Sequence, residues 1–447
     1  MIDELKAKEL SPLDGRYADI KELLSPFFSE YAYVKYRVFV EIKWLIYLIE
    51  NNFLKTTSKD RDKILNIYNT FDIKSYLEVK KEESITNHDV KAIEYYIDKK
   101  LKKVGLESVT SFVHFALTSE DINNTAYALM LKDFLSTLYL DKIEEFLNYL
   151  KELADKYKNV AVLAHTHGQP ATPTTVGKEF KVYWYRLNNE LTKLKQVSIM
   201  AKFNGATGNY SAFHVAYKDK DIVGLSKRFI ESLGLTFNPY TTQIENHDYI
   251  VTILDLIRHI NNIFLDLNLD MWLYISKGYF KLEVINQEVG SSTMPHKVNP
   301  INFENSEANL EMANGLLVVL TNKLPRSRMQ RDLSDSSCLR NLGVAFGYSL
   351  QGIKETLKGL KKVIVNEEKI TRDLNDNYEV LAEAIQTMLR KYGITNAYQA
   401  LKDLTRGKKI NKEILHKFIK TLPISEEDKK ILLELKPNTY VGLADKL

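Results

Sequence analysis

Residues that interrupt helices are scarce in this chain, and their scarcity constrains the fold more than any other feature. Neither glycine nor proline occurs between Gly105 and Gly168. Glycine disfavours helices because of its backbone freedom, and proline because it lacks an N–H group. The 447 residues include 18 glycines and 10 prolines, well below the usual frequencies of about 7% and 5%. The sequence therefore predicts long α-helices.

The spacing of apolar residues within the breaker-free stretches supports this prediction. Between Leu131 and Leu153 apolar residues recur mostly every three or four positions, which is typical of one wide helix face. Thr118 precedes acidic residues and marks the expected start of this helix, which we expect to end near Lys156–Lys158. A stricter alternation of four and three, typical of a helix bundle, runs through Ile253, Ile257, Ile260, Phe264, Leu267, Met271 and Tyr274.

These patterns predict an all-α protein with three domains. Another breaker-free stretch lies between Gly177 and Gly205, and further helices are expected over 302–324 and 339–363. The long helices place a central bundle at residues 109–360, between helical domains of shorter elements at 1–108 and 361–447. Such long apolar faces exceed what one chain can cover, so we also expect an oligomer.

Composition excludes several classes of protein. The chain has 62 Lys and Arg against 58 Asp and Glu, a net charge of +4 that argues against a nucleic-acid binder. The single Cys338 excludes an internal disulfide and a multi-cysteine metal site, and it fits a reducing cytosol. No apolar run approaches the length of about 18 residues that a membrane span needs, and the charged start is unlike a signal peptide. We therefore expect a cytoplasmic protein.

Two non-helical segments gather functional side chains. Residues 290–300 (GSSTMPHKVNP) contain two prolines and precede a predicted helix, so their free backbone amides suit carboxylate or phosphate oxygens. Residues 165–173 (HTHGQPATP) offer histidines, whose side chains transfer protons near neutral pH. The alternatives are an ordinary polar loop and a structural turn. A metal site at His165 and His167 lacks a nearby acid or cysteine to complete it.

Three smaller polar segments have both functional and structural interpretations. Residues 86–89 (TNHD) and 118–121 (TSED) open predicted helices, and the second could serve only as a helix cap. Arginines at 328, 331 and 340 surround acidic and hydroxyl residues, where they could bind a phosphate or form a solvated ion-pair network. Phosphate-loop, dinucleotide-binding and Gly-x-Ser-x-Gly motifs are absent from the sequence.

Together these segments resemble a known family. The loop at 290–300 is similar to the signature loop of the fumarase/aspartase superfamily, whose members release fumarate by anti elimination. The other segments resemble the bacterial adenylosuccinate lyases, and they are residues 11–17 (SPLDGRY), 86–92 (TNHDVKA), 166–173 (THGQPATP), 241–245 (TTQIE) and 331–336 (RDLSDS). The resemblance runs from about residue 10 to the C-terminus. Asn246 departs from it, because relatives are expected to have proline there.

The resemblance implies a reaction and roles for individual residues. The family cleaves adenylosuccinate to AMP and fumarate, and it releases fumarate from the succinyl-aminoimidazole-carboxamide ribotide of purine synthesis. It implies Ser291 as the base and His167 as the acid, with Lys297 and Asn299 stabilising the charge that develops on a carboxylate. It implies no metal and no organic cofactor. The substrate-binding residues that it implies are Arg16, Tyr17, Asn87, His88, Asp89, Thr118, Ser119, Gln243, Arg331, Ser336 and Arg340.

Two alternative functions are considered. Another fumarate-releasing lyase, such as an argininosuccinate lyase, is disfavoured by the segments at 86–89 and 331–336. A non-catalytic helical scaffold protein would have lost Ser291 or His167, and both are present.

The predicted helix also bears on assembly. A helix from residue 119 to about 156 is roughly 57 Å long, whereas the substrate spans on the order of 15 Å. Thr118 and His167 lie beyond opposite ends of it. The helix length therefore predicts that more than one chain forms each active site. The family resemblance implies the same arrangement in a homotetramer, with three chains contributing to each site.

Overall fold

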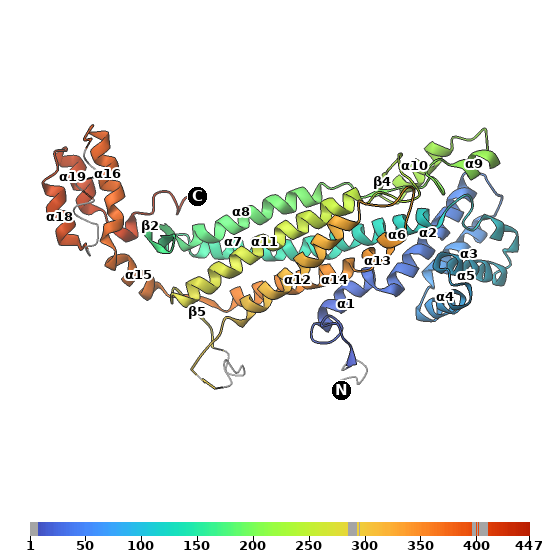
Figure 1. The fold of residues 1–447 in the computed structure, drawn as a ribbon, viewed down its shortest axis with the longest axis horizontal. Coiled ribbons are helices and arrows are strands. Elements are labelled where there is room, and N and C mark those ends of the chain that lie inside the picture. The colour runs from blue at the N-terminus through green and yellow to red at the C-terminus, as the bar shows by residue number, and fades with distance from the viewer. Residues whose placement is uncertain (1–7, 285–292, 295, 396–398, 400, 402–409) are drawn as a thin grey trace. The chain divides into compact units, whose positions relative to one another are not determined.

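The computed structural model describes residues 8–284, 293–294, 296–395, 399, 401 and 410–447. Helices dominate these residues, and the strands form three small two-stranded sheets, so the all-α prediction is confirmed (Figure 1). The chain divides into two compact units. The first contains residues 1–142, 190–262 and 308–353, and the second contains residues 143–189, 263–307 and 354–447. The division into three consecutive domains stays a prediction.

The elements of the first unit come mainly from the N-terminal third of the chain. They are α1 (Ala18–Phe28), α2 (Glu30–Glu50), α3 (Ser58–Asn69), α4 (Ile73–Thr86), α5 (Asp89–Lys103), the 3-10 helix η2 (Glu107–Phe112), α6 (Ser119–Phe134), the π-helical turn η3 (Leu135–Tyr139), β3 (Met200–Ala201), α9 (Ser211–Ala216), α10 (Ile222–Ser232), β4 (Thr236–Phe237) and α13 (Ser334–Leu339).

Five helices contribute residues to both units. They are α7 (Leu140–Lys156), α8 (Val176–Lys195), α11 (Asp248–Ser276), α12 (Ile301–Lys323) and α14 (Leu342–Lys361). The second unit adds β1 (Ala161–Thr166), β2 (Gln169–Thr175), β5 (Phe280–Leu282), β6 (Val363–Val365), α15 (Glu367–Asp376), η4 (Tyr378–Leu381), α16 (Ala382–Lys391), α18 (Lys412–Lys420), α19 (Glu426–Glu434) and η5 (Pro437–Thr439).

The long helices form where the breaker-free stretches predict them. The helix expected from residue 119 is made of α6, η3 and α7 in succession, ending at Lys156. It differs from the prediction in its π-helical turn at Leu135–Tyr139. Helices α12 and α14 begin and end within a few residues of the expected limits. Helices α8 and α11 each cover only part of the corresponding breaker-free stretch.

Buried polar side chains join α11, α12 and α14, which run alongside one another in Figure 1. In the first unit, Asn261 donates to Asn314 at 3.0 Å and accepts from Ser349 at 2.6 Å. In the second unit, Asn268 donates to Ser306 at 2.8 Å and accepts from Thr356 at 3.0 Å. A buried amide without its partner is costly, so these contacts oppose any slippage of the helices that would separate them.

The apolar core of the first unit lies among α2, α3 and α5. Val38, Ile42, Ile64, Ile93 and Leu101 are each 0% exposed. In the second unit, β1 and β2 form an antiparallel hairpin over residues 161–175, so the predicted non-helical character of residues 165–173 is confirmed. In the part of the chain that the structure describes, no helix is both long enough and apolar enough to cross a membrane.

Candidate active site

The first unit contains a polar cavity of about 580 Å³. Its wall is formed by α2, the N-terminal ends of α5 and α6, the loop at residue 243 and the segment 331–340. The lining residues are Tyr33, Arg37, Glu83, Asn87, His88, Asp89, Thr118, Ser119, Asn123, Tyr127, Gln243, Arg331, Leu333, Ser336, Ser337 and Arg340.

Nine of the residues singled out from the sequence meet in this cavity, although they come from four distant segments. They are Asn87, His88, Asp89, Thr118, Ser119, Gln243, Arg331, Ser336 and Arg340. Arg16 and Tyr17 belong to the same unit but are not among its lining residues. His167, Lys297 and Asn299 belong to the second unit. Ser291 lies outside the described residues.

Two helices begin at the cavity wall. His88 caps α5, and its Nδ1 accepts a hydrogen bond from the Lys91 backbone N–H at 3.2 Å. Thr118 caps α6 in a reciprocal arrangement with Asp121. The N-terminal end of a helix carries partial positive charge even where side chains cap some of its N–H groups. The cavity wall therefore favours anionic groups.

Arg37 and Asp89 form an ion pair in the cavity. The Arg37 side chain is 2% exposed, lies over the Tyr33 ring at 3.6 Å and donates to the Asp89 carboxylate at 2.8 Å. Burial acts to raise the pKa of Asp89, but the charge of Arg37 and its hydrogen bond outweigh burial and hold that pKa below its ordinary value. Burial also raises the pKa of Tyr33 to about 12, so its hydroxyl stays protonated at neutral pH.

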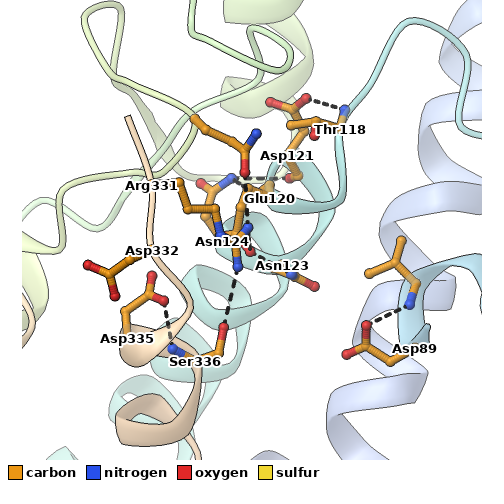
Figure 2. A network of polar contacts seen from close by, with 12 residues as sticks. Asp89, Thr118, Glu120, Asp121, Asn123, Asn124, Arg331, Asp332, Asp335 and Ser336 are labelled. Carbon is orange, nitrogen blue, oxygen red and sulfur yellow. Dashed lines mark hydrogen bonds and ion pairs between the residues drawn. The ribbon is translucent and has the colours of Figure 1, made fainter. Parts of the chain in front are cut away.

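Arg331 is held from three sides (Figure 2). Its Nη1 lies 2.7 Å from Glu120 Oε1 and donates to Gln243 Oε1 at 3.3 Å, and its Nη2 lies 3.5 Å from Ser336 Oγ. The Glu120 side chain is only 4% exposed. Because a buried carboxylate fixes the direction of the guanidinium, Arg331 is oriented before any ligand binds.

A buried ion pair anchors the N-terminal end of α6. The side chains of Asp121 and Lys202 are both 0% exposed, and Lys202 Nζ lies 3.1 Å from Asp121 Oδ1. The Asp121 carboxylate also accepts from the backbone N–H groups of Thr118, Asn204 and Gly205 at 2.8 to 3.3 Å. This pair therefore connects Thr118, which lines the cavity, to the loop at 202–205.

A second ion pair holds the loop that leads to Thr118. His114 and Ala116 both have positive φ, a backbone conformation that is strained for residues with a side chain. His114 Nδ1 lies 2.6 Å from Glu41, whose carboxylate also accepts the His114 backbone N–H at 3.2 Å. Burial acts to lower the pKa of His114, but the charge and hydrogen bond of Glu41 outweigh burial and raise it.

His167 lies at the tip of the hairpin in the second unit. Thr166 pairs with Gln169, so His167 and Gly168 are the two turn residues, with φ of 53° and 73°. Positive φ at both positions is the geometry of a type I′ turn, which usually holds asparagine or glycine. The turn exposes the His167 side chain. In the same unit Lys297 is exposed and Asn299 is partly buried.

Sequence reasoning missed part of the cavity wall. Tyr33 and Arg37 lie on the buried side of α2, and Tyr127 lies on that of α6, where periodicity assigns them to the core. The charged residues Arg37 and Glu41, one turn apart in a largely apolar stretch of α2, were the available signal, because a buried charge needs a partner. Glu83 and Asn123 had no distinct pattern, whereas Leu333 and Ser337 belong to the polar segment between Arg331 and Arg340 that the sequence marks.

Comparison with known proteins first defines the class. The fumarate lyase of Mesorhizobium sp. BNC1 superposes with a TM-score of 0.77 at 17% identity, covering 96% of each chain. The β-carboxy-cis,cis-muconate cycloisomerase of Acinetobacter calcoaceticus gives a TM-score of 0.73, also at 17% identity and 96% coverage of each chain. The chain therefore has the helical fold that these enzymes share.

Sequence comparison then defines the family. A family model described as "Lyase" matches residues 28–315, and one described as "Adenylosuccinate lyase C-terminal" matches residues 327–441. The adenylosuccinate lyase of Legionella pneumophila strain Corby is 50% identical over 443 residues, covering 98% of this chain and 97% of the relative. That of Escherichia coli K12 is 46% identical over 440 residues, covering 97% and 96%. The chain belongs to the adenylosuccinate lyase family.

The Asp121–Lys202 pair predicts a large loss of stability on neutralisation. Asp121→Asn leaves a buried lysine without its counter-charge, so the free energy of unfolding should fall by about 3–5 kcal/mol in urea titrations. Glu231→Gln is the matched control, because Glu231 forms an exposed pair with Lys227 and should change that energy by about 0–1 kcal/mol. Equal losses in the two variants would contradict this account.

The His114–Glu41 pair predicts a pH-dependent contribution to stability. Because the pKa of folded His114 is raised, its protonation stabilises the fold fully below the ordinary histidine value of about 6.5 and ceases to do so as pH rises through the raised pKa. His114→Asn keeps a residue that tolerates positive φ but does not titrate. The stability lost in His114→Asn should therefore be larger at pH 6 than at pH 9 in denaturant titrations, and a constant difference would refute the pair's role.

Proposed function

We propose that this chain is a carbon–nitrogen lyase that splits adenylosuccinate into AMP and fumarate. It would release fumarate in the same way from succinyl-aminoimidazole-carboxamide ribotide, within cytoplasmic purine synthesis. The cavity of the first unit carries the proposal, because it combines three oriented arginines with two helix N-terminal ends. These features suit a substrate with a phosphate and two carboxylates.

The reaction needs a base and an acid. In our proposal Ser291 removes the proton from the succinyl carbon beside a carboxylate, and Lys297 and Asn299 stabilise the extra charge that develops there. His167 protonates the departing nitrogen. The exposed turn at the hairpin tip supports this role, because it leaves the His167 ring accessible to a substrate.

The cavity residues divide into two groups in this proposal. Arg331, Ser336 and Arg340 bind the nucleotide and its phosphate, together with Arg16 and Tyr17. The second group contacts the succinyl group and the nucleobase, and it consists of Asn87, Asp89, Thr118, Ser119 and Gln243. His88 is a second histidine that contacts the substrate.

We further propose a homotetramer in which more than one chain forms each site. The cavity wall has three arginines and two carboxylates, Glu83 and Asp89, so its net charge is only +1 with His88 neutral. The substrate carries on the order of four negative charges. Additional cations such as Lys297 are therefore needed, and a neighbouring chain can supply them.

Exposed apolar helix faces also support assembly. Met312 and Val319 on α12 are 55% and 60% exposed, and Gly315 lies between them. No atom of the described residues lies within 4 Å of a Cβ added at Gly315. A glycine inside a helix costs about 1 kcal/mol relative to alanine, and an open glycine face suits the close approach of another helix. On α11, Leu269 and Leu273 are 49% and 50% exposed.

The proposed activity is tested with purified protein and each succinyl substrate. An ultraviolet assay, with fumarate measured separately, should detect cleavage of adenylosuccinate but none of argininosuccinate or malate. Ser291→Ala and His167→Ala should each lower turnover by at least about 100-fold, the usual contribution of an acid or base, while substrate still binds. Fumarate formed from argininosuccinate at a comparable rate would refute the specific assignment, and near-full turnover in Ser291→Ala would require another base, such as His88.

Shared sites are tested by mixing two inactive variants. His167→Ala and Ser291→Ala are dissociated together and reassembled, which places both intact residues in some hybrid sites. Activity should return to a fraction of that of the unaltered protein. Each variant carried alone through the same procedure is the control. Persistent inactivity of well-formed hybrids, or full activity in a stable monomer, would show that one chain forms the whole site.

A further inference from the structure

His247 is a buried histidine that the proposed reaction does not use. It directly precedes α11 in the first unit and is 2% exposed. Its φ is 64°, in the left-handed region that glycine and asparagine adopt more easily. A histidine keeps this strained conformation only where its surroundings hold it, and such positions cluster around functional sites.

The side chain of His247 contacts a carboxylate on a distant segment. Its Nε2 lies 3.2 Å from Asp335 Oδ2, and both side chains are nearly inaccessible to solvent. Burial acts to raise the pKa of Asp335, but the hydrogen bond and charge of His247 outweigh burial and lower that pKa. An ionised carboxylate can only accept, so Nε2 of His247 carries the proton in this contact.

The backbone of His247 is fixed from its own side of the contact. Its N–H donates to Glu245 Oε2 at 2.7 Å, and Glu245 Oε1 accepts from Asn238 at 2.9 Å. The Glu245 side chain is 2% exposed. The ring of His247 is therefore held at a defined position relative to the loop at 238–247.

The partner of His247 leads directly to the cavity wall. Asp335 Oδ1 accepts the backbone N–H of Ser336 at 2.7 Å, and Ser336 lies 3.5 Å from the Arg331 guanidinium. Figure 2 shows Asp335 and Ser336 beside each other on this segment, with Arg331 reaching across to α6. The backbone N–H of Gln243 donates to the Gln330 carbonyl at 3.2 Å. The loop at 238–247 and the segment 330–336 are therefore joined at two places, through Gln243 and Gln330 and through His247 and Asp335. These two contacts hold the part of the cavity wall that carries Gln243, Arg331 and Ser336.

We infer that His247 is a positioning residue, which holds Asp335 and thereby sets Ser336 and Arg331 for binding the nucleotide part of the substrate. The ligand assignment rests on the proposed function, whereas the positioning of the segment does not. Glycine at position 247 would relieve the backbone strain and remove only the ring. If only the backbone conformation at residue 247 mattered, this variant would bind the substrate at least as well as the unaltered protein. If the His247 ring positions Asp335, the variant binds the substrate more weakly.

The first test is binding by His247→Gly. The KM for adenylosuccinate and the Kd for AMP, measured by calorimetry, should each rise at least 10-fold, while kcat changes less than about 3-fold. Added imidazole should restore part of the binding by occupying the space of the ring. His259→Ala is the matched control, because His259 also contacts a carboxylate, Glu190 at 3.2 Å, but is joined to no cavity residue by that contact. It should leave KM, Kd and kcat unchanged.

The second test does not depend on activity. Hydrogen exchange at residues 331–336 should speed up at least 10-fold in His247→Gly and stay unchanged in His259→Ala. If the unaltered protein neither cleaves adenylosuccinate nor binds AMP, the proposed function fails, but this exchange result still decides the positioning role. Unchanged exchange, or unchanged KM and Kd in a folded variant, would overturn the inference. If His247→Gly does not fold, His247→Asn is measured instead, because asparagine tolerates positive φ and has a shorter donor.

Discussion

The candidate site depends on the contacts that the buried carboxylate of Asp121 makes. It faces a lysine that is also fully buried, and it receives backbone N–H groups from both the start of α6 and the loop at 202–205. Two buried charges are tolerated only when their geometry is good and their remaining hydrogen bonds are satisfied. Asn124 adds to this, because its amide pairs with both the N–H and the carbonyl of Lys202. The position of Thr118 at the cavity wall follows from this network.

Carboxylates set the direction of each arginine in the cavity. Asp89 accepts from Arg37, Glu120 faces Arg331, and Glu30 pairs with Arg340. Such pairing lowers the net positive charge of the wall, but it orients the guanidinium groups before a ligand arrives, and this reduces the entropy cost of binding. The paired arginines therefore attract anions less strongly, but they are already oriented for a ligand. Because Glu83 and Asp89 also line the cavity, its lining residues carry little net charge.

A constant sequence offset relates α11 to the segment that leads into α14. In the first unit Gln243 pairs with Arg331, His247 with Asp335 and Asn261 with Ser349, each 88 residues apart. In the second unit Asn268 pairs with Thr356 and Asn366 with Gly278 at the same separation. A constant difference means that the two stretches run parallel and in register. The contacts that hold the cavity wall are thus the first members of a series that the buried asparagine contacts continue.

The sequence by itself determined the helices, because breaker scarcity and three-four apolar spacing are local properties of the chain. It also marked Asn87 and Thr118 through polar segments at predicted helix starts, and Arg331 through a group of arginines around acidic and hydroxyl residues. Their meeting in one cavity could not be read from spacing. Tertiary structure alone decided that Arg37 faces Asp89 and that His247 reaches Asp335, since burial of a charge depends on which distant residue faces it. Periodicity gives a residue its helix face but not its partner, and in this protein the partners define the site.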